Sequence, residues 1–141
     1  MRRRLRKLHV DDREYVWRAE IGCLPGDGGD LHRCINVHIW GAGKNSRVLV
    51  ADLLSTSKSV GWHPAVTDGA YPTADDIRQL IDRALTLGWE PDTLGGTFLL
   101  TESSGLELPR FLITDRVHSS DAPDPTARVI QANEHRPKAD T

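Results

Sequence analysis

Apolar and polar residues alternate over much of the first half of the chain. Between Glu14 and Gly22 the charged positions share one parity, and the other parity is apolar. A period of two is typical of a strand with one buried face. Leu31 to Trp40 repeats this pattern, with apolar residues at 35, 37 and 39. Shorter apolar runs at 5–10, 47–54, 97–101 and 110–114 are bounded by turn-forming residues, so the pattern predicts up to six strands.

One segment has a period near 3.6 instead. Apolar residues recur at positions 77, 80, 81, 84 and 85, which places them on one face of a helix. Thr73 is the expected N-cap, and Asp76, three residues later, forms a variant of the capping box. Gly88 is the expected C-cap, and Pro91 prevents continuation. The sequence therefore predicts a single strong helix over residues 73–88.

These elements predict an α+β fold, with an antiparallel sheet of four to six strands and the 73–88 helix packed on one face. The length of 141 residues fits one domain, which we assign to residues 1–118. From Ser119 onward the chain is rich in Asp, Pro, Ala and Arg, and Val129 and Ile130 are its few large apolar residues. We therefore expect residues 119–141 to be a polar, flexible tail that folding does not require.

The charge of the chain is uneven. Hydrophobic residues make up 38% and charged residues 27%, a globular composition, and the formal net charge is -2. Residues 1–18 contain seven Lys or Arg and three Asp or Glu, which gives +4 and leaves -6 for the rest. A charge-guarded edge strand is the favoured interpretation. Nucleic-acid binding is the alternative, and it would use the basic side chains Arg2, Arg3, Arg4 and Arg6.

The two cysteines, Cys23 and Cys34, are too few for a disulfide framework and indicate a reduced, cytoplasmic setting. No apolar run approaches the length of a membrane span, and no apolar segment follows the basic N-terminus as in a signal peptide. We expect no cofactor and no contact with a membrane. His32 and Cys34 share one face of a predicted strand, so they are weak candidate metal ligands, with His9 or Cys23 as a third. The favoured alternative is a mixed polar face with Cys34 half buried.

Residues 55–72 form a long connection without periodicity, and such loops are often functional. Its Ser55-Thr56-Ser57-Lys58 run matches Ser-x-x-Lys, but the partner motifs of that catalytic type are missing. Its hydroxyls and Lys58 can still bind an anion. The glycines at 41–43 resemble part of a phosphate-binding loop, but they join two predicted antiparallel strands, so a hairpin turn explains them.

Four aromatic and imidazole side chains form the main candidate binding surface. Trp62 and His63 lie in the long loop, and Trp40 and His38 lie on the more polar face of their predicted strand. Tryptophan offers a large contact area and histidine a directional polar contact, as in recognition surfaces. The alternative is that these side chains pack on each other as a minor core.

Two segments carry a resemblance to a family. Residues 9–18, His-Val-Asp-Asp-Arg-Glu-Tyr-Val-Trp-Arg, resemble the Val-Asp-Gly-Arg-x-Tyr-x-Trp hairpin that opens small uncharacterised domains of high-GC, actinobacterial-type bacteria; Asp12 replaces the turn glycine. Residues 84–91 and 95–100 are similar to the Gly-Trp-x-Pro helix end and the next strand of that family. The resemblance covers about residues 8–115 and implies a strand-rich domain with one main helix. It transfers no activity and no site residues.

We expect a non-enzymatic module that binds another protein, such as an immunity or accessory protein in a bacterial gene neighbourhood. The chain lacks paired catalytic carboxylates, a Ser/His/Asp set and a CxxC motif at recognisable spacing. The alternative is a small-molecule-binding protein or weak hydrolase that uses His38, His63 and the 55–72 loop. A concave site lined by Trp40, Trp62 and His63 would favour the alternative, and a flat face would favour protein binding.

Overall fold

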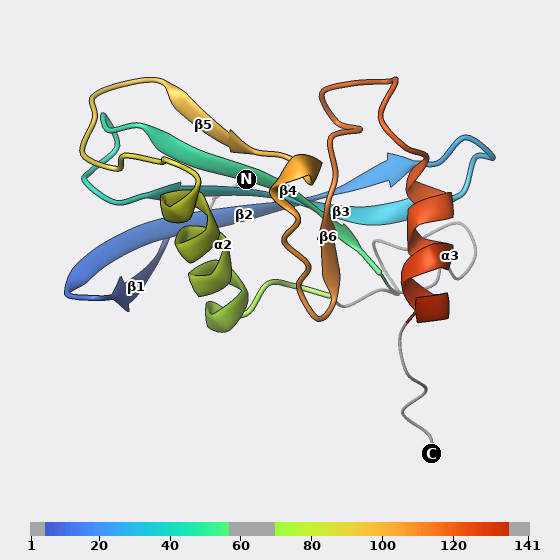
Figure 1. The fold of residues 1–141 in the computed structure, drawn as a ribbon, viewed down its shortest axis with the longest axis horizontal. Coiled ribbons are helices and arrows are strands. Elements are labelled where there is room, and N and C mark those ends of the chain that lie inside the picture. Colours follow the sequence, from blue (N-terminus) through green and yellow to red (C-terminus); the bar gives the residue numbers. More distant parts are fainter. Residues whose placement is uncertain (1–4, 57–69, 136–141) are drawn as a thin grey trace, which may run out of the picture.

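The computed structural model describes residues 5–56 and 70–135. This part of the chain has an α+β fold with a six-stranded sheet and two α-helices (Figure 1). The elements in chain order are β1 (Arg6–Val10), β2 (Arg13–Pro25), β3 (Leu31–Trp40), β4 (Val48–Ser55), α2 (Ala74–Thr86), β5 (Thr97–Leu100), the 3₁₀ turn η1 (Glu102–Ser104), β6 (Phe111–Ile113) and α3 (Pro125–His135). The six predicted strands are confirmed within a few residues at each end.

The sheet is mostly antiparallel, with strand order β1-β2-β3-β4-β5. Strands β1 to β4 form an antiparallel meander, and β6 pairs antiparallel with the end of β4. β5 pairs parallel with β4, so the prediction of an entirely antiparallel sheet is wrong for this pair. The reason is the connection through α2, since a crossover helix returns the chain to the same end of the sheet.

The first hairpin explains where β1 ends. Asp11 and Asp12 form its turn with φ angles of 49° and 67°, the positive values that a two-residue type I′ turn requires. Aspartate tolerates this conformation because its side chain can bond to the nearby backbone. β1 pairs only with Arg13–Trp17, the first part of a strand that continues to Pro25.

Helix α2 begins at the predicted N-cap, Thr73, but its C-cap lies one residue before the predicted Gly88. The Asp76 amide donates to Thr73 Oγ1 at 3.1 Å, and the Thr73 amide donates to Asp76 Oδ2 at 2.9 Å, which completes the capping box. The C-cap is Leu87, and Gly88 follows it with a φ of 110°. Neither described helix is long and apolar enough to cross a membrane.

The main hydrophobic core contains buried side chains of both α2 and the sheet, and we name the side of the sheet that carries its strand residues the first face. This core contains the buried side chains of α2 together with alternate residues of β2, β3 and β4: Ile77, Leu80, Ile81, Ala84, Tyr15, Trp17, Ile35, Val37, Ile39, Leu49, Ala51 and Leu53. The intervening residues point to the second face. On that face Glu20, Asn36 and Asp52 are direct neighbours across three strands.

A second helix, α3, lies within the segment predicted to be a flexible tail. Val129 is buried against Leu24, Cys34 and Leu54, which form a small apolar cluster on the second face. Asn133 Nδ2 donates to the Thr56 carbonyl at 3.0 Å. The described residues therefore contain two α-helices, where the sequence predicts one. The α3 segment was missed because its buried apolar residue, Val129, is too isolated in the sequence to form a recognisable apolar stripe.

Candidate functional site

Trp40 and His38 lie together on the second face, and Lys58, Trp62 and His63 lie outside the described residues. The rings of Trp40 and His38 stack with centroids 5.9 Å apart, and the Arg18 guanidinium lies 5.3 Å from the Trp40 ring centroid. Trp40 is almost fully buried. In the part of the chain that the structure describes, Trp40 is thus a packed residue with a cation–π contact rather than a protruding anchor.

His32 and Cys34 share the second face, as predicted. His32 Nε2 lies 2.7 Å from Thr126 Oγ1, and the Cys34 thiol lies in the apolar cluster beneath α3. Burial lowers the pKa of His32 and raises the pKa of Cys34 to about 12. Cys23 pairs with Arg33 and so points to the opposite face from Cys34. Within residues 5–56 and 70–135, no three His, Cys, Asp or Glu side chains are grouped to hold a metal ion.

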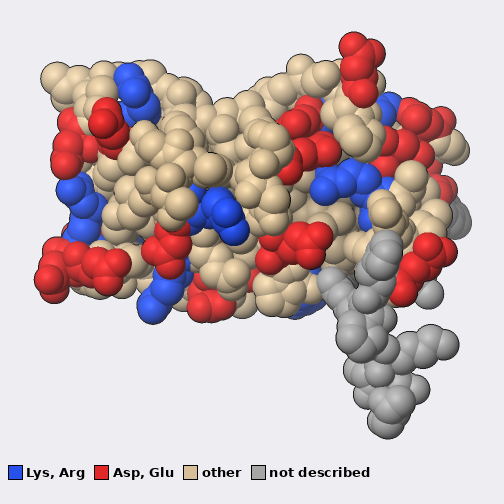
Figure 2. Space-filling view, viewed as in Figure 1, with Lys and Arg blue, Asp and Glu red and all other residues tan. Residues whose placement is uncertain are grey.

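Of the predicted basic arm, the structure describes Arg6 but not Arg2, Arg3 or Arg4. The Arg6 guanidinium lies 5.8 Å from the Trp17 ring centroid and 5.7 Å from that of Tyr71. Figure 2 shows acidic and basic side chains interspersed over the side of the molecule that it draws, without a continuous basic stripe. Arg6 therefore contributes to aromatic packing at the start of β1.

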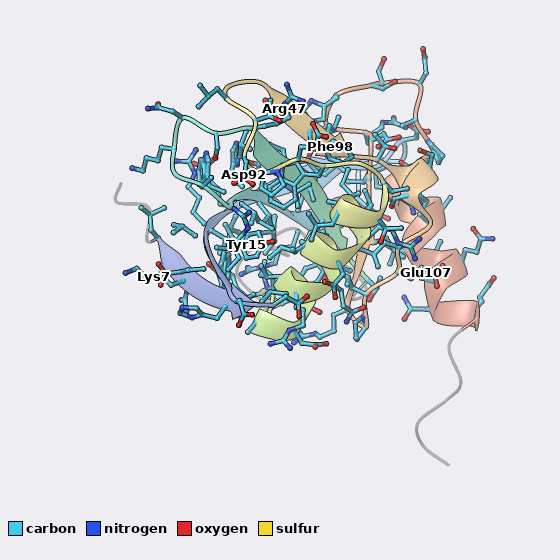
Figure 3. All side chains as sticks on the ribbon, turned by 60° about the vertical axis from the view of Figure 1, so that its left-hand side comes forward. Lys7, Tyr15, Arg47, Asp92, Phe98 and Glu107 are labelled. Atoms are coloured by element: carbon cyan, nitrogen blue, oxygen red, sulfur yellow. The ribbon has the colours of Figure 1, made fainter. Side chains whose placement is uncertain are left out.

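A groove of about 830 Å³ lies between α2 and α3. The 107–112 segment forms part of it and lies between the two helices in Figure 1; Figure 3 shows Glu107 beside α3. The groove is lined by four polar or charged residues and four apolar ones: Gln79, Glu107, Arg128, Gln131, Leu108, Pro109, Leu112 and Ala132. We name it the α2–α3 groove.

Local bonds hold the walls of the α2–α3 groove in place. The Leu108 amide donates to the Phe111 carbonyl at 3.1 Å, which closes a tight turn at Pro109. On α3, the Arg128 guanidinium donates to the Ile113 carbonyl and lies 3.5 Å from the Glu102 carboxylate. Arg128 thus fixes α3 to the end of β6. Sequence reasoning missed this groove because one wall is α3, which the sequence does not predict.

A smaller pocket of about 290 Å³ opens where β2, β3 and β4 lie side by side. Its lining includes Glu20, Asn36, Asp52 and Val117. Asp52 is only 2% exposed, and its two carboxylate oxygens accept from Asn36 Nδ2 and His118 Nε2, both at 2.8 Å. His118 is 50% exposed. We name this arrangement the Asp52–His118 pocket.

The chemistry of this pair follows from the tautomer that we assign. A neutral imidazole that donates from Nε2 to Asp52 keeps its Nδ1 lone pair as an acceptor. The carboxylate therefore orients the ring, as second-shell carboxylates do in metal and catalytic sites. His118 lies 66 residues from Asp52, so their spacing gives no signal. The available signal is Asp52 itself, a charged residue within the otherwise apolar run of β4.

Comparisons with protein families, curated proteins and solved structures found no match to this chain. The interpretation of function therefore depends on the α2–α3 groove and the Asp52–His118 pocket themselves.

Proposed function

We propose that the protein is a non-enzymatic binding module and that the α2–α3 groove receives a segment of another protein. The volume and lining of this groove support the proposal. A groove of about 830 Å³ with half of its lining residues polar or charged resembles a protein interface, which combines an apolar centre with a polar rim. Small-molecule pockets are more often closed and mainly apolar.

The lining also indicates which kind of segment fits. Leu108 and Leu112 offer apolar contact, so the partner segment should place an aliphatic or aromatic side chain against them. Gln79 and Glu107 supply polar contacts at the walls. The Arg128 guanidinium already lies 3.5 Å from the Glu102 carboxylate, so the partner segment does not need to be strongly acidic to balance its charge. We therefore propose a polypeptide segment with one apolar anchor and few charges.

A selection from a random-peptide display library tests this proposal and does not require the partner protein itself. Peptides selected on the immobilised full chain should bind in solution and shift NMR signals of residues in the α2–α3 groove. Ala132→Arg places a long side chain in the groove and should weaken these peptides at least 30-fold. Ala127→Arg, an exposed position of α3 outside the groove lining, is the matched control and should leave their affinity unchanged.

Two results would contradict the proposal. One is a library selection that yields no peptide with signals in the groove. The other is equal binding to the Ala132→Arg and Ala127→Arg variants, which would place the peptide site elsewhere. Circular dichroism on both variants ensures that lost binding is not lost folding.

The Asp52–His118 pocket favours a second candidate function, binding of a small polar molecule. Its volume of about 290 Å³ lies near the lower end for ligand sites, and Asp52, a buried carboxylate in its lining, also bonds to the imidazole of His118. A fragment screen by NMR on the wild type and His118→Gln tests this alternative. Fragments that lose binding only in the variant would support it, and a screen without hits in this pocket would contradict it.

Several expectations from the sequence remain proposals. These are the contribution of Trp40, His38, Trp62, His63 and Lys58 to recognition, kinship with the actinobacterial-type domains, an immunity or accessory role, and a cytoplasmic location. The α2 helix as the main helical cover of the sheet belongs with them. The peptide selection bears on the first, because peptides that shift Trp40 signals instead of groove signals would favour the predicted aromatic surface.

A further inference from the structure

Leu94 is an exposed apolar side chain in the connection from α2 to β5. It is 80% exposed, more than any other large hydrophobic side chain in the described part of the chain. Single exposed leucines are common on protein surfaces, so this exposure alone carries no functional meaning. The backbone that presents Leu94, and the residues beside it, are what set it apart. We name residues 93–97 the tip segment.

Hydrogen bonds to the connection between β3 and β4 hold the backbone on both sides of Leu94. The Arg47 amide donates to the Thr93 carbonyl at 2.7 Å, and the Gly95 amide donates to the Asn45 carbonyl at 2.8 Å. Leu94 is therefore presented to solvent by a fixed backbone. A fixed anchor loses little conformational freedom when it binds, so it is better suited to recognition than a leucine on a loose loop.

Two side chains also fix the residues that lead into the tip segment. Trp89 is 2% exposed, and its Nε1 donates to the Arg47 carbonyl at 3.1 Å. The Arg13 guanidinium donates to both carboxylate oxygens of Asp92, each at 2.9 Å. Because Arg13 and Asp92 satisfy each other, the charges beside the tip segment do not demand a charged partner.

The tip segment has the chemistry that the α2–α3 groove is proposed to receive. Residues 93–97 read Thr-Leu-Gly-Gly-Thr, so they carry one aliphatic side chain and no charge. The groove offers Leu108 and Leu112 for apolar contact, and Arg128 in its lining already lies 3.5 Å from Glu102. An uncharged segment with a single apolar anchor therefore complements this groove.

The two surfaces lie at different places on one molecule. Figure 1 shows the connection from α2 to β5 turning at the end of the sheet away from α3, which forms one wall of the groove. The bonds to the β3–β4 connection hold the tip segment there. A tip segment therefore reaches the groove of another molecule and not that of its own chain.

We propose that the tip segment of one copy of this chain occupies the α2–α3 groove of a second copy, with Leu94 against Leu108 and Leu112. This inference rests on the proposed function of the groove and names its partner. The contact joins two different surfaces, so it is heterologous. Each pair leaves one groove and one tip segment free, and association then continues head to tail into chains or closes into rings.

Two variants each remove one of the two surfaces. Leu94→Asp places a charge on the tip segment, and Ala132→Arg obstructs the groove. Analytical ultracentrifugation of the full wild-type chain, over roughly 1 µM to 1 mM, should detect association, and either variant should weaken it at least tenfold. Ile21→Asp is the matched control, because Ile21 is 47% exposed and lies on β2, and it should leave the association unchanged.

Mixing the two variants is the sharper measurement. The intact tip segment of the Ala132→Arg chain can enter the intact groove of the Leu94→Asp chain. An equimolar mixture should therefore form a heterodimer that does not grow further, although neither variant associates alone at the same concentration. Formation of this heterodimer also shows that both variants are folded.

A wild-type chain that stays monomeric to 1 mM would overturn the proposal. Association that Leu94→Asp abolishes and Ala132→Arg leaves intact would also overturn it, because the tip segment would then bind elsewhere. If library-selected peptides still bind the groove in either case, the proposed function stands and only the second copy is excluded as its occupant. If no such peptide binds, both fail.

Discussion

Val129→Ala tests whether α3 is part of the folded domain. Val129 is 3% exposed and packs against Leu24, Cys34 and Leu54. The substitution removes two methyl groups, each contributing about 0.8 kcal/mol when buried. The unfilled space adds a cavity term, so we expect the free energy of unfolding to fall by about 1.5–3 kcal/mol.

Urea denaturation followed by circular dichroism measures this change. Ile130→Ala is the matched control, because Ile130 is the next residue of the same helix and is 54% exposed. It should change the free energy of unfolding by less than about 0.5 kcal/mol. Equal urea midpoints for the Val129→Ala and Ile130→Ala variants would refute the docking of α3 and support a flexible tail over residues 119–141. Truncation after His118 should then also leave the midpoint unchanged, whereas docking predicts a clear decrease.

Three further measurements address the core, the cysteines and the buried histidine. Leu80→Ala should lower the free energy of unfolding by about 2–5 kcal/mol, because Leu80 is fully buried; an unchanged urea midpoint would remove α2 from the core. A thiol reagent at pH 8 should modify Cys23 rapidly and Cys34 only after unfolding, because burial raises the pKa of Cys34 to about 12; rapid modification of both would contradict its burial. Burial also lowers the pKa of His32 below its ordinary 6.5, so below pH 6.5 the unfolded chain binds this proton more readily than the folded chain does. The free energy of unfolding should therefore fall as the pH drops from 7 to 5, and it should fall less steeply for the His32→Gln variant. The same pH dependence in both proteins would exclude this contribution of His32.

The elements that the sequence predicts correctly are those with local signals. The alternation in β2 and β3 reflects side chains that point to opposite faces of one strand. The α2 helix has an apolar stripe, and Thr73 and Asp76 cap its start within three residues of each other. Each of these signals depends on neighbours in the chain, so one sequence is enough to read them.

The features that the sequence does not predict depend on distant partners. The apolar run of β5, Thr97–Leu100, has the same sequence pattern whether the neighbouring strand is parallel or antiparallel. The crossover through α2 makes β5 run parallel to β4. Asp52 and His118 carry no signal at a spacing of 66 residues, although a charged residue in an apolar strand marks one of them. The α2–α3 groove needs both α2 and α3, so it could not be predicted without the second helix.

The docking of α3 on the second face also bears on the order of events during synthesis. His32 and Thr126 are 94 residues apart, so the meander from β1 to β4 leaves the ribosome well before α3 is made. Domains generally fold as units, and an incomplete chain transiently exposes hydrophobic surface. Until α3 arrives, Leu54 and Cys34 would lack the cover of Val129. A nascent or prematurely ended chain therefore exposes an apolar patch that the finished domain conceals, and chaperones and proteases recognise such surface in unfinished proteins.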